Sequence, residues 1–208
     1  MAETRGTHTR RAHTGRRRNE ATRQAVLQAV RDLLHSVSYR EVTLDAIARR
    51  AGASRQTLYR WWPSRAAMVL DGLTADAAER VTIPESGPLR DRLIQFLAST
   101  IAGIVGPQGT GPALRGLMAE AQLDPEIRTG LLQSFVSARR QALREVLITG
   151  QRSGELRAET DLDLLVDLAF GLIWYRLLVD HLPLHSDVAG GLADKLLSDS
   201  HHPAGCRP

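Results

Sequence analysis

Aromatic residues, cysteine and long apolar runs are all scarce in this chain of 208 residues. Aromatic side chains make up only 4% of it, and no alternation of β-branched and polar residues persists, so we expect a nearly all-helical fold. The single cysteine, Cys206, excludes a disulfide framework within the chain. No apolar run is long enough to cross a membrane, and the first residues lack the apolar core of a signal peptide. We therefore expect a cytoplasmic protein.

Patterns typical of catalysis or metal binding are also missing. No histidine pair has metal-binding spacing on a shared helix; the histidines are His8, His13, His35, His181, His185, His201 and His202. The Gly-rich segment 106–112 lacks the Lys-Ser/Thr pair of a phosphate-binding loop, which indicates an ordinary connector. A nucleophile and a base can meet in space without sequence proximity, but nothing here favours such a pair. We expect no enzymatic activity, no cofactor and no metal.

Positive charge is concentrated at the start of the chain. Residues 1–65 contain 14 Arg and Lys against 5 Asp and Glu, whereas residues 66–208 contain 13 against 18. A basic N-terminal part on an acidic remainder would orient the molecule toward a polyanion such as DNA. The acidic part would be repelled, which argues against a protein that coats nucleic acid with its whole surface.

The segment 43–65, TLDAIARRAGASRQTLYRWWPSR, contains two short predicted helices joined by a tight turn. The first has apolar residues at helical spacing, namely Leu44, Ile47, Ala48 and Ala51. Thr43 is suited to cap this helix, and Gly52 is suited to end it in the left-handed conformation. Ser54 can cap the second helix, and Pro63 bars it from continuing. A helix, a Gly-containing turn and a second helix are the pattern of a helix-turn-helix.

The second of these helices carries side chains suited to reading DNA. Arg55 and Gln56 begin it, and these residue types make bidentate contacts with guanine and adenine in the major groove. Recognition helices present their N-terminal residues to the bases. Tyr59 lies one turn further on and can offer its hydroxyl to a phosphate. Any surface helix can carry Arg and Gln, so this helix alone favours DNA binding over an ordinary helical hairpin without excluding the latter.

The run 42–68 resembles the DNA-binding domain of the TetR family of bacterial transcriptional regulators. In that family a Thr opens the second helix, A-G-x-S forms the turn, and T-L-Y lies within the recognition helix. An aromatic-Pro-Ser-basic step then leads to the fourth helix. These elements are present here as Thr43, residues 51–54, residues 57–59 and residues 62–65, and with the preceding helix the match covers roughly residues 20 to 70.

Two positions depart from the family pattern. Ser38 stands where a Gly often precedes the aromatic residue that ends the first helix, which predicts a less relaxed turn. Arg65 replaces the more usual Lys and changes a point cation into a planar fork; we interpret it as a phosphate contact. The candidate DNA-binding residues are Thr43, Arg55, Gln56, Thr57, Tyr59, Arg60, Trp61 and Arg65.

Residues 1–18 form a basic arm that contains six arginines and no core-forming residues, so we expect it to be disordered. The arm either follows phosphates or enters the minor groove, or it is a solvated tail that supplies unspecific attraction. The DNA-binding domain is expected over 19–65. Its first helix is predicted over 19–37, with Asn19 as a cap whose positive helix end could hold a phosphate.

Residues 66–198 are expected to form a larger helical domain for effector binding and dimerisation, followed by a flexible tail over 199–208. Ser64 can cap its first helix, and Asp124 with Pro125 is a strong helix start. Helices are predicted over 64–81, 88–105, 113–122, 124–154, 161–181 and 186–197.

The resemblance implies a homodimer in which the last two helices form a four-helix bundle with their copies. The helices over 161–181 and 186–197 fit, because they are too apolar to face water on more than a narrow strip. Small residues at Ala169, Gly171 and 190–191 would let helices approach closely. The same apolar stripe could instead be ordinary core of one chain.

The resemblance also implies a repressor that a small apolar or amphipathic effector releases from a palindromic operator. The alternative is an activator, or a ligand-independent regulator of the same fold. A ligand wedged near Leu73 or Ala77 would tilt the helix that begins at Ser64 and change the separation of the two DNA-binding heads. Candidate pocket residues, each of which could also be plain core, are Phe96, Met118, Phe135, Trp174 and Tyr175.

Overall fold

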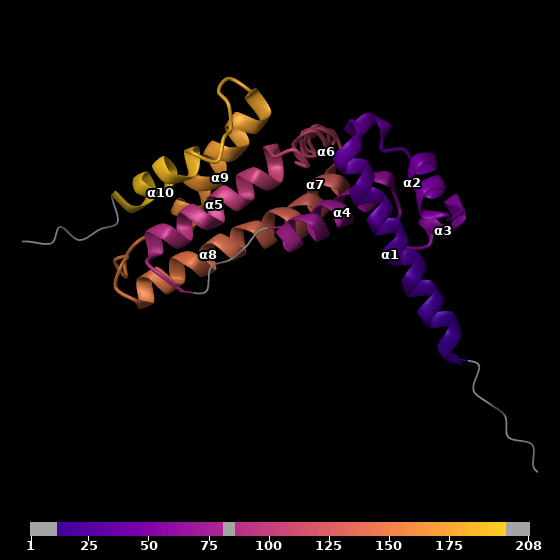
Figure 1. Cartoon of the computed structure of the whole chain (residues 1–208), viewed down its shortest axis with the longest axis horizontal. Coiled ribbons are helices and arrows are strands. Elements are labelled where there is room, and N and C mark those ends of the chain that lie inside the picture. The colour runs from indigo at the N-terminus through magenta and orange to yellow at the C-terminus, as the bar shows by residue number, and fades with distance from the viewer. Residues whose placement is uncertain (1–11, 81–85, 199–208) are drawn as a thin grey trace, which may run out of the picture.

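The computed structural model describes residues 12–80 and 86–198, and these residues form helices and connecting turns with no strand (Figure 1). A small head contains α1 (Ala12–Ser36), α2 (Leu44–Ala51) and α3 (Arg55–Tyr59). The body contains α4 (Arg65–Arg80), α5 (Leu89–Val105), α6 (Gly111–Leu123), α7 (Pro125–Leu131), α8 (Ser137–Arg152), α9 (Leu162–Val179) and α10 (Val188–Ser198). The prediction of an all-α protein, with a helix-turn-helix head followed by a helical body, is confirmed.

Local sequence signals set the helix ends in the head. The Thr43 hydroxyl accepts a hydrogen bond from the amide of Ala46 at 3.2 Å, and the Ser54 hydroxyl accepts one from Thr57 at 3.2 Å. Gly52 ends α2 with φ of +60°, a left-handed conformation that side chains other than glycine rarely adopt. These caps fix the angle of the turn, and therefore the position of α3 relative to α2.

A compact core holds the three helices of the head together. Side chains from α1, the 3-10 turn Tyr39–Glu41, α2 and α3 are fully or nearly fully buried in it: Val26, Val30, Leu34, Tyr39, Val42, Ile47 and Leu58. Trp62 closes this core, and its indole nitrogen donates to Asp71 of α4 at 2.8 Å. The head is thus packed onto the first helix of the body, and α1 lies along α4.

The first helix differs from its prediction. It begins at Ala12, well before Asn19, so Asn19 lies inside the helix and its backbone does not form a free helix end for a phosphate. Arginine is a good helix former, which allows the basic residues before Asn19 to continue the helix. Residues 1–11 of the expected arm and residues 199–208 of the expected tail lie outside the described residues.

The long helix predicted over 124–154 contains an irregular segment. Asp124 caps its start, as expected, by accepting from the amides of Glu126 and Ile127 at 2.9 and 3.3 Å. Between α7 and α8, however, residues 132–136 form a π-helical turn that carries Phe135 into the body. Such turns insert one residue into the helical repeat and are frequent at functional sites.

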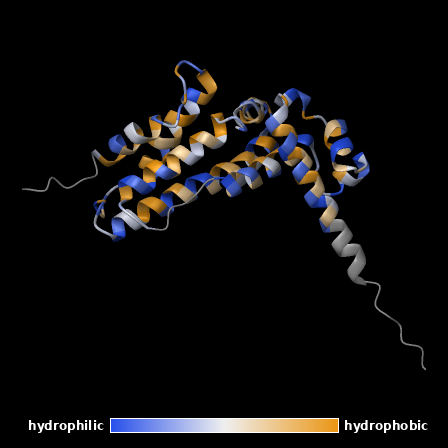
Figure 2. Ribbon diagram, in the orientation of Figure 1, coloured by the Kyte–Doolittle hydropathy of each residue, from blue (hydrophilic) through white to orange (hydrophobic). Residues whose placement is uncertain are grey.

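The last two helices lie together along one side of the body (Figure 1). α9 is capped by Asp161, which accepts from the amide of Leu164 at 3.0 Å, and its ribbon is mostly apolar (Figure 2). α10 packs against both α5 and α9. In the described part of the chain, no helix combines the length and the apolar character needed to cross a membrane.

Candidate DNA interface and ligand pocket

The recognition helix α3 is anchored by one buried residue and presents its other side chains outward. Leu58 is fully buried in the head core. Arg55, Gln56 and Arg60 are exposed, and Tyr59 keeps 51% of its surface accessible. Two further candidates also lie in this part of the head: Thr43 is exposed at the start of α2, and Thr57 is half-buried. The arrangement gathers cationic and hydrogen-bonding groups on one convex helix surface, as base and phosphate contacts require.

Arg55 is paired with an acid of the preceding helix. Its Nε and Nη2 both donate to the carboxylate of Asp45 in a bidentate ion pair between α3 and α2. This hydrogen bonding raises the pKa of the Arg55 guanidinium and lowers the pKa of the Asp45 carboxyl. The group best suited to read guanine is therefore held in place, and partly neutralised, by its own protein.

Aromatic residues border α3 on its C-terminal side. The guanidinium of Arg60 lies 4.6 Å from the centre of the Trp61 ring, and Trp61 meets Trp62 edge to face at 5.8 Å between ring centres. Trp61 is half-buried, whereas Trp62 is buried. A cation stacked on an indole is oriented at little entropic cost, which suits Arg60 for a phosphate.

Arg65 turns toward the body, in contrast to its interpretation as a phosphate contact. It donates to the backbone carbonyl of Tyr39 at 3.1 Å, pairs with Glu120 of α6 and lies 4.4 Å over the Tyr39 ring. The Tyr39 hydroxyl donates to the same carboxylate at 2.6 Å. Burial and this hydrogen bond raise the pKa of Tyr39. We call Tyr39, Arg65 and Glu120 the α6 latch, because they tie head to body.

A second cluster, which we call the His35 cluster, links α1 to the last turn of α4. Oδ1 of the buried Asp76 lies 3.0 Å from His35 Nε2 and accepts from Arg80 Nε at 2.8 Å. Arg80 Nη2 also lies 3.0 Å from His35 Nε2. A single ring nitrogen can either donate to Asp76 or accept from Arg80, so the cluster has two alternative hydrogen-bonding arrangements.

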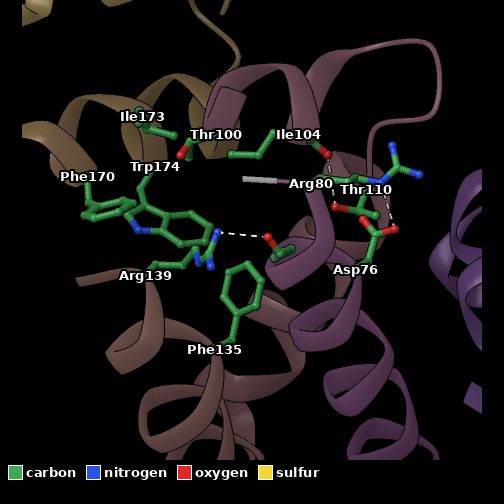
Figure 3. A pocket seen from close by; sticks show the side chains of 12 residues that line it. Asp76, Arg80, Thr100, Ile104, Thr110, Phe135, Arg139, Phe170, Ile173 and Trp174 are labelled. Carbon is green, nitrogen blue, oxygen red and sulfur yellow. Dashed lines mark hydrogen bonds and ion pairs between the residues drawn. The ribbon is translucent and has the colours of Figure 1, made fainter. Parts of the chain in front are cut away.

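The body contains a pocket between α4, α5, α8 and α9, with Asp76 and Arg80 at its head side (Figure 3). Its apolar lining consists of Ala77, Ile104, Phe135, Phe170, Ile173 and Trp174, and its other polar lining of Thr100, Thr110 and Arg139. The cavity has a volume of about 30 Å³, which is enough for water but not for a drug-sized ligand. A ligand must therefore displace side chains to enter.

Two family models match the chain, one for each part of the molecule. Residues 26–71 match bacterial regulatory proteins of the tetR family, and residues 83–196 match the Tetracyclin repressor-like C-terminal domain. The chain belongs to the TetR family. TetR-family regulators are DNA-binding transcription factors rather than enzymes, and they function as dimers.

Relatives of this TetR-family chain are similar over most of their length. The HTH-type transcriptional regulator YdeS of Bacillus subtilis is 33% identical over 165 residues, which cover 79% of this chain and 82% of YdeS. The TetR family transcription regulator SCO0332 superposes with a TM-score of 0.77 at 30% identity, over 89% of this chain and 99% of that one. FadR from Bacillus subtilis, solved in complex with stearoyl-CoA, shares the fold at 16% identity, with a TM-score of 0.67 over 86% of this chain and 99% of its own.

The predicted pocket residues of this TetR-family chain divide into two groups. Phe135 and Trp174 line the pocket and meet edge to face, with ring centres 6.5 Å apart. Phe96 is instead buried in the core, and Met118 packs against the core without lining this pocket. Tyr175 is 58% exposed and stacks on His181 at the surface, since it follows Trp174 directly and so points to a different side of α9.

The polar half of the pocket was missed by sequence reasoning. Arg139 resembles an ordinary helix-surface residue in the sequence, whereas Thr100 lies within the apolar stripe of α5 and resembles a core residue. The π-helical turn before α8 shifts the helical register, so spacing alone could not place Arg139 beside Trp174. Asp76 could have been suspected from the sequence, because it is an acidic residue within the apolar face of α4.

Proposed function

We propose that this protein is a homodimeric repressor that binds a palindromic operator and is released from it by a small molecule in the body pocket. One observation carries the proposal. Asp76 and Arg80 line the pocket and also hold His35 of α1, so the same two side chains face the ligand site and the DNA-binding head. A ligand that shifts α4 must therefore act on the head.

On the DNA side, Arg55 and Gln56 are proposed to read bases in the major groove. Their place in the first turn of α3 is the one that recognition helices present to base edges. Thr43, Thr57, Tyr59, Arg60 and Trp61 surround them as proposed phosphate and backbone contacts. One short helix offers few base contacts, so a two-fold dimer would double the site, with half-sites about 34–36 Å apart or a multiple of that distance.

The dimer is proposed to form through α9 and α10, which carry an unusual amount of exposed apolar surface. Leu164, Leu168 and Tyr175 of α9 are 54%, 53% and 58% exposed. A groove of about 680 Å³ runs between α9 and α10, lined mainly by leucines. A Cβ atom added at Gly171 would meet no atom within 4 Å, so packing inside one chain does not explain a glycine there. A second helix approaching closely would explain it.

The effector role is supported by the pocket and by one neighbour. The pocket lies at the junction of four body helices and has a largely apolar lining. FadR, which has the same fold, was solved with stearoyl-CoA bound. A pocket ligand would lower operator affinity only by favouring a body conformation in which the heads no longer fit their half-sites.

The coupling can be tested before any effector is known. Ala77 of α4 lines the pocket and the neighbouring Ala78 is exposed, so Ala77→Met places a wedge in the pocket and Ala78→Met is the matched control. The operator would first be selected from random duplexes, and fluorescence anisotropy would measure binding to it. Ala77→Met should bind about tenfold more weakly, because overpacking costs about 1–3 kcal/mol. The control Ala78→Met should bind as tightly as the unsubstituted protein. Unchanged binding by a folded Ala77→Met dimer would contradict the proposal.

A further inference from the structure

Arg139 brings an uncompensated positive charge into the pocket. Its Nη1 donates to the backbone carbonyl of Ala77 at 3.2 Å, and the structure places no carboxylate in ion-pair distance of it among the described residues (Figure 3). Burial lowers the pKa of its guanidinium. Two other arginines of α8 differ, since Arg140 pairs with Asp167 and Arg144 with Asp163 at the surface. Of these three arginines, Arg139 is thus the one that lines the pocket and has no anionic partner in the described part of the chain, an arrangement that costs stability unless something else pairs with it.

A second polar group in the same pocket also has no partner. Thr100 of α5 is 6% exposed, and its hydroxyl is buried without a hydrogen bond. Buried hydroxyls are nearly always hydrogen-bonded, so an isolated one that lines a cavity indicates a missing acceptor or donor. Thr100 and Arg139 come from different helices and face the same space (Figure 3).

The other charges of the lining cancel. Asp76 pairs with Arg80 at 2.8 Å, which leaves Arg139 as the excess charge. The rings of Phe135, Phe170 and Trp174 line the same pocket. A complementary ligand must then be negative at one end and apolar along its body.

We propose that the pocket takes a small amphipathic carboxylate. Its carboxylate pairs with Arg139, its apolar part separates Phe135 from Trp174, and Thr100 bonds a polar atom of the same molecule. This inference rests on the proposed effector role of the pocket and names the chemical class of the effector.

The same pairing supplies a mechanism for release. In the ligand-free protein Arg139 holds the carbonyl of Ala77, which belongs to the last turns of α4. A carboxylate competes for this guanidinium and draws it away from α4. The helix then loses a tether to α8 at the point where it also carries the His35 cluster, so ligand binding loosens the support of the head.

Paired probes test the charge requirement directly. Isothermal titration calorimetry of the full-length protein would compare benzoate, phenylacetate and octanoate with benzamide, phenylacetamide and octanamide. At least one carboxylate should bind one site per chain at least about tenfold more tightly than its amide, a difference of about 1.4 kcal/mol. Arg139→Gln should abolish this preference. The matched control Arg140→Gln, which changes an arginine already paired with Asp167, should keep it.

The ligand-free protein provides a second measurement. Arg139→Met removes a partly buried cation that has no anionic partner among the described side chains, and the relief of its desolvation cost should outweigh the lost hydrogen bond to the Ala77 carbonyl. The melting temperature should therefore rise. A decrease of several degrees would show that Arg139 is a structural residue and overturn the proposal. The proposal is equally overturned if each acid binds no better than its amide, or if no acid binds at millimolar concentration.

These outcomes separate the ligand class from the effector role. Equal binding of acids and amides in the pocket would reject the carboxylate and leave the effector role intact. A carboxylate that binds through Arg139 without weakening operator binding would support the ligand class and reject effector release.

Discussion

The base contact proposed for Arg55 has a competitor within the protein, because the guanidinium is already paired with Asp45. To contact a guanine, its guanidinium must leave or share the carboxylate of Asp45. Both side chains are about 60% exposed, so water screens the pair and the exchange costs little. A guanine in the operator can offer Arg55 two hydrogen bonds in place of those to Asp45. A phosphate on random DNA must compete for the same guanidinium with the Asp45 carboxylate, which is also negative. Asp45 therefore favours discrimination over general attraction.

Substituting Asp45 tests this role. Asp45→Asn should tighten binding to random duplex several-fold, with a salt slope steeper by about one unit per head, because one more cation is free for phosphates. The ratio of operator to random affinity should fall. Anisotropy titrations at several salt concentrations measure both, with Glu145→Gln on the body as a control for lost negative charge. Equal affinities of Asp45→Asn and Glu145→Gln for random duplex would show that Asp45 does not compete with phosphates for Arg55.

The sequence predicts residue roles well where a role depends on neighbours along the chain. Thr43, Gly52 and Ser54 were identified because a cap bonds to amides within one turn. The pairing of Arg65 was not predicted, because its partner, Glu120, is 55 residues away and belongs to a helix with no sequence link to the head. Long-range ion pairs depend on how the helices pack, which local patterns do not encode.

At the scale of single helices, α9 carries the two proposed functions, ligand binding and dimerisation, on different sides. Phe170, Ile173 and Trp174 face the pocket, while Leu164, Leu168 and Gly171 face outward. An apolar run of this kind predicts a helix but not its orientation, since nearly every side of the run is apolar. The position of Tyr175 could for that reason not be derived from spacing. The π-helical turn before α8 is a comparable case, because no turn residue marks it.

A bulky residue at Gly171 tests the outward side of α9. Gly171→Trp should fold normally, since a Cβ there meets no atom of its own chain within 4 Å, but it should block a partner helix. Sedimentation should then give a monomer of 22.8 kDa in place of a dimer. Gly171→Ala adds only one methyl group at the proposed helix contact and should weaken the dimer far less than Gly171→Trp. A dimeric Trp variant would place the interface elsewhere.

For the whole molecule, two polar clusters lie at opposite ends of the contact between the head and α4. The α6 latch binds the start of α4, and the His35 cluster binds its end. The composition of the chain shows a basic head and an acidic body, and from this the sequence predicts the orientation on DNA. It does not predict the two clusters, because their members come from α1, α4, α6 and the 3-10 turn.

A double variant tests whether the His35 cluster transmits the signal. His35→Leu removes the bonds to Asp76 and Arg80 while keeping a side chain of similar bulk. If the cluster transmits the effect of Ala77→Met to the head, that substitution should weaken operator binding about tenfold in the native background. In the His35→Leu background it should weaken binding less than about threefold. The difference corresponds to a coupling energy within the usual 0.5–3 kcal/mol. Strictly additive losses would show that the effect reaches the head by another route.

The α6 latch has a mechanical consequence for α4. With Arg65 held to α6, the helix can act as a lever whose fulcrum is the latch and whose far end is Asp76. Eleven residues separate them, an arm of about 16 Å at 1.5 Å per residue, so a 1 Å push at the pocket turns α4 by about 3–4°. The head packs on α4 and turns with it. In the proposed dimer a two-fold axis relates the two levers, so rotations perpendicular to that axis have opposite sense and add, and the angle between the two recognition helices changes by up to twice the rotation of either.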